Sequence, residues 1–395
     1  MAKPDDRAPR DVFDRGTPTV LEHGVTLGEL RRRLRLWMRD PETGRLGRHH
    51  PADPAPIVLS GPGIGKSEML GDLARDVDGD FVDIRLASTP LIELMGLQSV
   101  DHARGRTVWN RSDLLPPADG GRGGILLIDE LTTSIPALQT EAYQILRERR
   151  VGPHRIPDTW FVLAAGNRVN DRGVYYQMPD PLVNRCWFFE LVPDLDDWLT
   201  WNMAHGHVAP EVHAFLRHAP QELYCRPLES RGVPFATPRS WTFASRTLQR
   251  WGACCPTDRA KALAEARIEV EGQLGPAMTA NFYAYLRFFR ELPDIEAVMR
   301  GAIDPAPPPE HKADLLYAIL GGLVGYVPTV ADLTPFLRYL LKLPPSYAIV
   351  GVVDALRHRG DVAARLEASP AWGAYAAKYH TAITAWRTTT LATVA

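Results

Sequence analysis

The residues best suited to chemistry form a glycine-rich segment, Ser60-Gly61-Pro62-Gly63-Ile64-Gly65-Lys66-Ser67, followed by Glu68. Glycines in such a loop let backbone N–H groups turn inward around phosphate oxygens, and a helix that begins there adds the positive end of its dipole. In this pattern Lys66 would reach the β- and γ-phosphates, and Ser67 would place its hydroxyl on Mg²⁺. We therefore predict that residues 61–68 bind ATP with Mg²⁺.

The first position of this loop departs from the usual pattern, which has Gly or Ala where this chain has Ser60. That position shapes the start of the turn and supplies no charge, so we expect Ser60 to be tolerated. The alternative is a chance glycine turn. The buried strand expected before the loop and the helix expected after it count against that alternative.

Two carboxylates end the apolar run Ile125 to Ile128, at Asp129 and Glu130. Asp129 would hold Mg²⁺ through its water shell, and Glu130 would orient and polarise the water that attacks the γ-phosphate. Two acids at a strand end are equally typical of a solvated turn. Their presence downstream of a phosphate loop, at a distance suitable for the same sheet, favours the catalytic interpretation.

Three further polar residues could complete such a site. Asn167 follows the apolar run Phe161 to Ala165, which places it at the carboxyl edge of a parallel sheet, where ligands of open α/β folds bind. Arg185 precedes the last apolar run. Arg239 stands in the first turn of a helix capped by Thr237, where a cation opposes the helix dipole and a phosphate would compensate it. A surface salt bridge is the alternative for Arg239.

The elements that must position these residues alternate along the first half of the chain. Short apolar runs of the kind that form buried strands begin at Ile57, Phe81, Ile125, Phe161 and Trp187, and helical periodicity separates them, as in Ala137 to Arg149. This order predicts an α/β fold with a mostly parallel sheet covered by helices. After Pro193 the strand signals largely stop, and helix-like stretches continue to the end.

We accordingly expect four regions: a flexible N-terminus at residues 1–19, an α/β ATPase core at 20–192, a helical lid at 193–292 and a C-terminal helical region at 293–395. The proline run within residues 304–309 is the clearest linker, since consecutive prolines do not fit a helix interior. An amphipathic helix from Thr26 carries Arg31, Arg32, Arg33 and Arg35. We interpret its basic side as a solvated face or a subunit contact rather than a phosphate grip.

Composition narrows the class of protein. The chain has 395 residues, more than one core usually supports, and 45% hydrophobic with 23% charged residues is typical of a soluble globular protein. The apolar run Leu315 to Val327 is too short to span a bilayer and contains glycines, and the N-terminus lacks a secretory signal pattern. We expect a cytoplasmic protein with reduced cysteines. A net charge of −2 gives no reason to expect nucleic acid as the main partner.

Taken in order, these segments resemble the MoxR family of AAA+ ATPases over roughly Gly28 to Arg250. The most telling phrases are Glu148-Arg149-Arg150-Val151-Gly152, Ala164-Ala165-Gly166-Asn167-Arg168 and Thr237-Pro238-Arg239-Ser240-Trp241. The resemblance implies that Asp129 and Glu130 are a Walker B pair, Asn167 is sensor 1 and Arg239 is sensor 2 of the lid. It implies that Arg185 is an arginine finger that acts on a neighbouring subunit, so the chain would form a ring, expected to be a hexamer.

The same resemblance implies a protein client and a partner with a von Willebrand factor A domain, the chain acting as a remodelling or metal-insertion chaperone. It also places a pore-lining insert at Val100 to Trp109, with Arg104-Gly105-Arg106 at a hairpin turn. The chain departs from the family after Asp-Glu-Leu, where Thr132 and Thr133 stand in place of Asn-Arg. This departure puts in doubt any contact between subunits at those two positions.

Two other functions compete with a hydrolysing ring. The first is a nucleotide-gated scaffold that assembles with ATP and hardly hydrolyses it; the intact Glu130, Asn167 and Arg185 argue against it, because a pure switch could lose them. The second is a DNA-directed motor, supported only by the arginine helix and by Arg104 and Arg106. Stimulation of ATPase activity by DNA, sensitive to salt, would favour that motor.

Overall fold

The computed structural model describes residues 13–14, 24–39, 44, 46–47, 53–168, 171, 176–178, 180–227, 232–358 and 361–379. The chain divides into two compact units, residues 18–192 and residues 1–17 together with 193–395. The first is an α/β unit and the second is helical. Each is considered by itself.

A five-stranded parallel sheet forms the centre of the α/β unit, in the order β10-β2-β9-β6-β3. The strands are β2 (Ala55–Leu59), β3 (Asp80–Arg85), β6 (Gly124–Asp129), β9 (Trp160–Gly166) and β10 (Cys186–Glu190). Each of the five predicted apolar runs is one of these strands. Every residue of β9 is buried, as a continuous apolar run in the middle of a parallel sheet requires. The predicted α/β class with a parallel sheet is confirmed.

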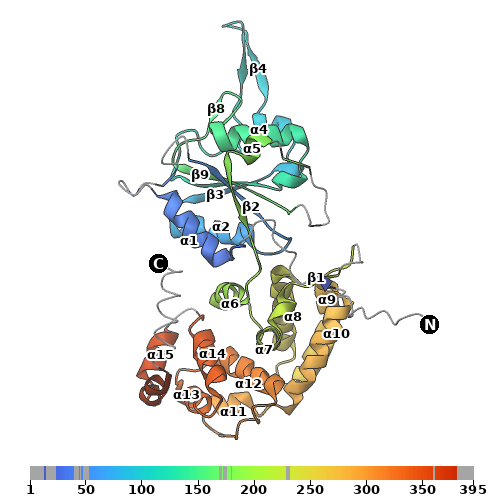
Figure 1. Ribbon diagram of the computed structural model, residues 1–395, viewed down its shortest axis with the longest axis vertical. Coiled ribbons are helices and arrows are strands. Elements are labelled where there is room, and N and C mark those ends of the chain that lie inside the picture. Colours follow the sequence, from blue (N-terminus) through green and yellow to red (C-terminus); the bar gives the residue numbers. More distant parts are fainter. Residues whose placement is uncertain are drawn as a thin grey trace, which may run out of the picture. The chain divides into compact units, whose positions relative to one another are not determined.

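Helices cover both faces of this sheet. Figure 1 shows α1 (Leu27–Met38) and α2 (Lys66–Asp76) on one face and α4 (Pro136–Glu148) on the other. Alternate strand residues serve the two faces: Leu126 and Ile128 pack in one core cluster with Ile145 of α4, whereas Ile125 and Leu127 are buried outside that cluster. The sheet is therefore covered on both sides, and its strand ends are where polar side chains collect.

The remaining parts of the α/β unit are short. The helix α3 (Leu91–Met95) leads into a hairpin of β4 (Gln98–Asp101) and β5 (Arg106–Trp109), which projects from the unit in Figure 1. A second small hairpin joins β7 (Arg150–Val151) to β8 (His154–Arg155), and α5 (Asp180–Val183) precedes β10. The hairpin predicted at residues 100–109 is thus present, two residues longer at its start.

The basic side of α1 is a solvated face with local partners. Arg31 pairs with Asp76 of α2, and Arg33 donates to Glu29 one turn earlier on the same helix, at 3.0 Å from Nε. Arg32 keeps 55% of its side chain exposed. These local acidic partners agree with a solvated face, one of the two interpretations of the arginine run.

The helical unit is built from α6 to α15 around one core. In chain order these helices are Leu195–Ala204, Pro210–His218, Pro238–Cys254, Arg259–Leu274, Pro276–Tyr285, Ile295–Met299, Ala313–Tyr326, Thr334–Leu340, Pro345–Ala355 and Val362–Ala368. A single cluster of buried residues runs from Leu195 to Tyr379. The helices that we assigned to a lid and to a C-terminal region therefore share one hydrophobic core.

The apolar run with glycines is the helix α12, which packs closely on α7. A side chain at Gly321 would meet Ala214 Cβ and the Pro210 carbonyl oxygen of α7, both at 2.7 Å, so only glycine permits this approach. The sequence 304–309 is an irregular connection between α11 and α12. Along the described residues, no helix is both long and apolar enough to cross a bilayer.

A buried carboxylate in the helical unit contacts one histidine and two arginines. Asp354 of α14 has no exposed side-chain surface and contacts His213 Nε2 at 2.7 Å, Arg217 Nε at 2.9 Å and the Arg357 guanidinium. Burial alone would raise the pKa of Asp354, but Arg217, His213 and Arg357 outweigh it and hold that pKa well below its ordinary range. Asp196 of α6 adds a second carboxylate, which contacts Arg217 at 2.9 Å. This network joins α6, α7 and α14.

Most of the predicted flexible N-terminus, residues 1–19, lies outside the described residues. Phe13 and Asp14 form the short strand β1, paired with β11 (Arg226–Pro227). All four cysteines, Cys186, Cys225, Cys254 and Cys255, are free thiols in this structure.

Candidate active site

The phosphate loop has the backbone that anion binding requires. It connects the end of β2 to the start of α2, and Gly63 and Gly65 adopt φ values of +73° and +108°, which favour glycine. The N-cap of α2 is Gly65, so no side chain caps its first N–H groups. A helix N-terminus left open in this way offers N–H donors and a positive dipole end to a phosphate.

The side chains of the loop and of the acidic strand meet at this point. Ser67 Oγ donates to Asp129 Oδ2 at 3.3 Å, and the Glu130 N–H donates to Asp129 Oδ1 at 2.7 Å. Both oxygens of Asp129 are thereby oriented. A serine hydroxyl beside an oriented carboxylate is an all-oxygen donor pair of the kind Mg²⁺ prefers, so these residues fit the ion that the fold implies.

Ser60 does more than shape the turn. It is fully buried, its N–H donates to the Gly166 carbonyl oxygen at 3.1 Å, and its hydroxyl accepts from Lys66 Nζ at 2.6 Å. The departure from Gly or Ala thus adds an acceptor for the lysine ammonium. The ammonium of Lys66 is thereby held at the first residue of the loop.

Glu130 is held in a strained backbone conformation. Its φ of +60° is left-handed, which a residue with a side chain adopts at a cost. Its carbonyl oxygen accepts from the Thr133 hydroxyl at 2.9 Å and the Ser134 hydroxyl at 2.8 Å, contacts that hold this turn. These contacts fix the backbone of the half-buried Glu130 at the end of β6.

Asn167 directly follows β9, at the carboxyl edge of the sheet, and its action as sensor 1 stays a prediction. Leu59 of β2 is paired with Gly166 of β9, so Asn167 leaves the same sheet edge as the phosphate loop. The next residue, Arg168, is 3% exposed, and its backbone N–H and its Nε donate to Asp171 Oδ2 at 2.9 Å and 3.3 Å. Arg168 also lies 3.7 Å from Glu190 of β10. This buried ion cluster ties down the chain directly after Asn167.

Arg185 lies at the amino ends of the strands, whereas the phosphate loop leaves their carboxyl ends. It immediately precedes β10, and Cys186 pairs with Ala55 at the amino end of β2. A strand of five residues puts Arg185 roughly 16 Å from the edge that carries the phosphate loop. The exposed guanidinium donates to the Tyr143 hydroxyl of α4 and lies 5.8 Å from the centre of that ring. Within one chain, Arg185 and the phosphate loop therefore lie at opposite ends of the strands.

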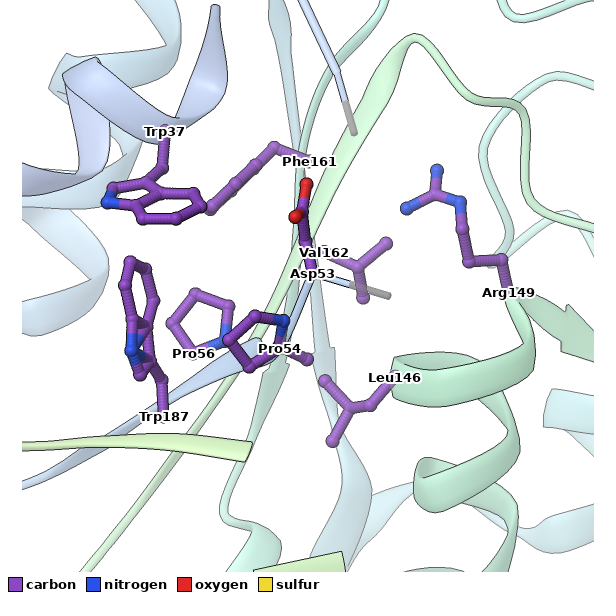
Figure 2. A pocket seen from close by; sticks show the side chains of 10 residues that line it. Trp37, Asp53, Pro54, Pro56, Leu146, Arg149, Phe161, Val162 and Trp187 are labelled. Atoms are coloured by element: carbon purple, nitrogen blue, oxygen red, sulfur yellow. The ribbon is translucent and has the colours of Figure 1, made fainter. Parts of the chain in front are cut away.

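A small cavity lies at the amino ends of the strands, away from the phosphate loop. It measures about 30 Å³ and lies between the first residues of β2, β9 and β10, with Trp37 and Trp187 against each other in a T-shaped contact at 4.4 Å (Figure 2). This volume holds about one water molecule and no nucleotide. The open loop at the carboxyl edge, rather than this cavity, is the candidate active site.

Arg239 belongs to the helical unit, where its predicted helix start is confirmed. Thr237 is the N-cap of α8 and forms a capping box with Ser240, and Pro238 opens the helix. Arg239 is exposed in the first turn. Its action as sensor 2 stays a prediction.

No protein-family model matches this sequence, and no curated protein matches it. Solved structures do match. NtrX from Brucella abortus is 13% identical, over 60% of this chain and 53% of that one, with a TM-score of 0.34. This chain therefore spans about half of NtrX.

Two forms of RuvB from Thermotoga maritima match over more of their length. A mutant form is 13% identical, over 70% of this chain and 84% of that one, with a TM-score of 0.37. The RuvB Holliday junction branch migration motor is 15% identical, over 75% and 80%, with a TM-score of 0.35. Because these likenesses are low, we infer the function from the site itself.

Two polar residues of the site had no predicted role there. Asp83 stands within the apolar run of β3 and faces the acidic pair; burial, then Asp129, raises its pKa to about 6, against the opposing charge of Arg85. Thr132 contacts the Asn167 backbone. Asp83 could have been found as a carboxylate inside a strand pattern. Thr132 could have been found from the departure after Asp-Glu-Leu.

Proposed function

We propose that this chain is an ATP-hydrolysing subunit of the AAA+ type, similar to the MoxR family. The observation that carries the proposal is the contact between Ser67 and Asp129, which joins the phosphate loop to the acidic strand beneath the open N-terminus of α2. The backbone of residues 61–68 would hold the phosphates of ATP, with Lys66 as the counter-charge. Ser67 and Asp129 would hold Mg²⁺.

The other residues act on the water and the γ-phosphate. Mg²⁺, when bound, supplies positive charge that offsets the charge of the phosphoryl oxygens. Glu130 accepts a hydrogen bond from the attacking water, aligns it in line with the bond to be broken and takes up its proton. Asn167, at the same sheet edge, hydrogen-bonds the water or the γ-phosphate and senses its departure.

A neighbouring copy would complete the site. Arg185 lies at the edge away from its own phosphate loop, and a permanently charged guanidinium there suits the γ-phosphate of another subunit. We therefore propose a closed ring, with Arg239 of the helical unit acting on the nucleotide as sensor 2. The number of subunits, expected to be six, follows from the family resemblance alone.

The work of this ring is proposed from the same resemblance. We propose that it remodels a protein client together with a partner that carries a von Willebrand factor A domain, in the cytoplasm. Co-purification of the chain with such a domain, strengthened by ATP, is the expected result. Specific binding of single-stranded or duplex DNA, in place of a protein client, would contradict this role.

The hydrolysis itself is tested with Glu130→Gln, which keeps the shape of the side chain and removes its ability to accept the water's proton. We expect turnover of ATP by the wild type, a fall in kcat of about 100-fold or more in the variant, and ATP affinity within about threefold. Equal and negligible turnover in both proteins, with ATP bound, would favour the nucleotide-gated scaffold instead.

A further inference from the structure

Thr132 joins the acidic turn to the sensor strand through a single hydroxyl. It lies in the short 3-10 turn Leu131–Thr133 directly after Glu130, and it is fully buried. Its Oγ1 accepts from the Asn167 N–H at 2.8 Å and donates to the Asn167 carbonyl oxygen at 3.1 Å. One side chain thus satisfies both peptide groups of Asn167, using the donor and the acceptor capacity of a hydroxyl.

The packing around this contact leaves no room for a different arrangement. A side chain at Gly166, the last residue of β9, would meet Thr132 Oγ1 at 2.7 Å and Thr132 Cγ2 at 2.9 Å. The methyl group of Thr132 therefore fills the space that the glycine leaves. Buried groups packed this tightly transmit a displacement rather than absorb it.

Thr132 is itself fixed from the other side. Its carbonyl oxygen accepts from the Tyr176 N–H at 2.8 Å. The buried Gln139 of α4 donates through Nε2 to the Leu131 carbonyl oxygen at 3.2 Å and to the Tyr176 carbonyl oxygen at 3.3 Å. These hydrogen bonds hold the backbone of Thr132 and link α4 to the turn after Glu130.

We propose that Thr132 is a positioning residue, which sets Asn167 relative to Glu130 for the attack of water on ATP. This inference rests on the proposed function. The position of the Asn167 side chain depends on its backbone, which is bonded to Thr132 and held by the Arg168 cluster that follows. Glu130 and Thr132 share one turn, so the water-orienting carboxylate and the sensor amide keep a fixed separation.

The experiment compares full-length variants that differ in one hydroxyl. Thr132→Val keeps the branched shape and removes both hydrogen bonds, whereas Thr132→Ser keeps the hydroxyl. We expect kcat to fall about 10- to 100-fold in Thr132→Val, with KM for ATP within about threefold, because misplacement of a catalytic group affects the transition state most. Thr132→Ser should retain kcat within about threefold. Thr140→Val, which loses an exposed hydroxyl bonded to the Pro136 carbonyl oxygen at 3.0 Å, is the matched control.

A second measurement separates positioning from damage to the fold. If Thr132 acts through Asn167, Thr132→Val should lower kcat less than about twofold in an Asn167→Ala background, since residues that act as a unit are not additive. Additive losses, or a kcat of Thr132→Val equal to that of the wild type, would overturn the proposal. Thr132→Ala replaces Thr132→Val if the latter does not fold. Absence of turnover in the wild type would instead overturn the proposed function, and the inference with it.

Discussion

Two charged sites of this chain, one in each unit, use charge in opposite ways. In the helical unit, Asp354 is fully buried and surrounded by His213, Arg217 and Arg357, so its charge is neutralised within the fold. In the α/β unit, Lys66 and Glu130 are only half-buried and lie around an open helix N-terminus. The contrast teaches that a buried, fully paired charge holds helices together, whereas charges arranged around an open loop are available to a ligand.

The largest expected effect is on stability, at the buried network. Asp354→Ala leaves buried cations without their counter-charge and should lower the free energy of unfolding by about 3–5 kcal/mol, with ATP affinity little changed while the chain is folded. Urea unfolding measures this loss. Asp361→Ala is the matched control, because its contact with Arg365 at 2.8 Å is made by a carboxylate that is 74% exposed; a loss below about 1 kcal/mol is expected there. Equal losses in the two variants would refute the contrast.

The opposite pattern is expected at the loop. Lys66→Ala removes a charged donor to phosphate and should weaken ATP binding by roughly 10- to 100-fold. The free energy of unfolding without nucleotide should change by no more than about 2 kcal/mol, because the variant loses a hydrogen bond to Ser60. Calorimetric titration with ATP measures the first quantity and urea unfolding the second. A large loss of stability with unchanged binding would show that Lys66 serves the fold.

Asp83 should make the stability of the fold depend on pH. Its pKa of about 6 in the folded chain lies above the ordinary value of 3.8 because of burial and the nearby Asp129, Glu130 and Glu68, with Arg85 opposing. Between these values the folded chain keeps a proton that the unfolded chain has lost, so stability falls as pH rises from about 4 to 6. Relative to Asp83→Asn, the wild type should lose stability across this window in urea unfolding and stay level above it. A pH-independent difference would contradict the raised pKa.

The sequence was most informative where one local pattern implies one geometry. The five strands are short, continuous apolar runs, and the loop at Ser60 to Ser67 needs the strand and helix that flank it, so both were predictable. The N-cap at Thr237 was likewise predictable from a local pattern. The position of Arg185 at the amino ends of the strands could also be predicted, because Arg185 directly precedes a parallel strand.

Contacts between distant segments could not be predicted in this way. Thr132 meets Asn167 across 35 positions and His213 meets Asp354 across 141, and neither pair has a spacing that periodicity would reveal. The shared core of the helical unit is of the same kind: the proline run at 304–309 indicated a linker, yet the helices before and after it pack together. Such pairings depend on tertiary packing rather than on local sequence.

In the proposed ring, the open phosphate loop of one subunit is completed by Arg185 from another subunit. Mixing subunits tests it most directly. Lys66→Ala and Arg185→Ala proteins should each be nearly inactive, and equal mixing should restore turnover at about a quarter of the interfaces, where an intact loop meets an intact arginine. Restored ATP turnover after subunit exchange is the result we predict; two inactive proteins that stay inactive when mixed, although their subunits exchange, would contradict the account.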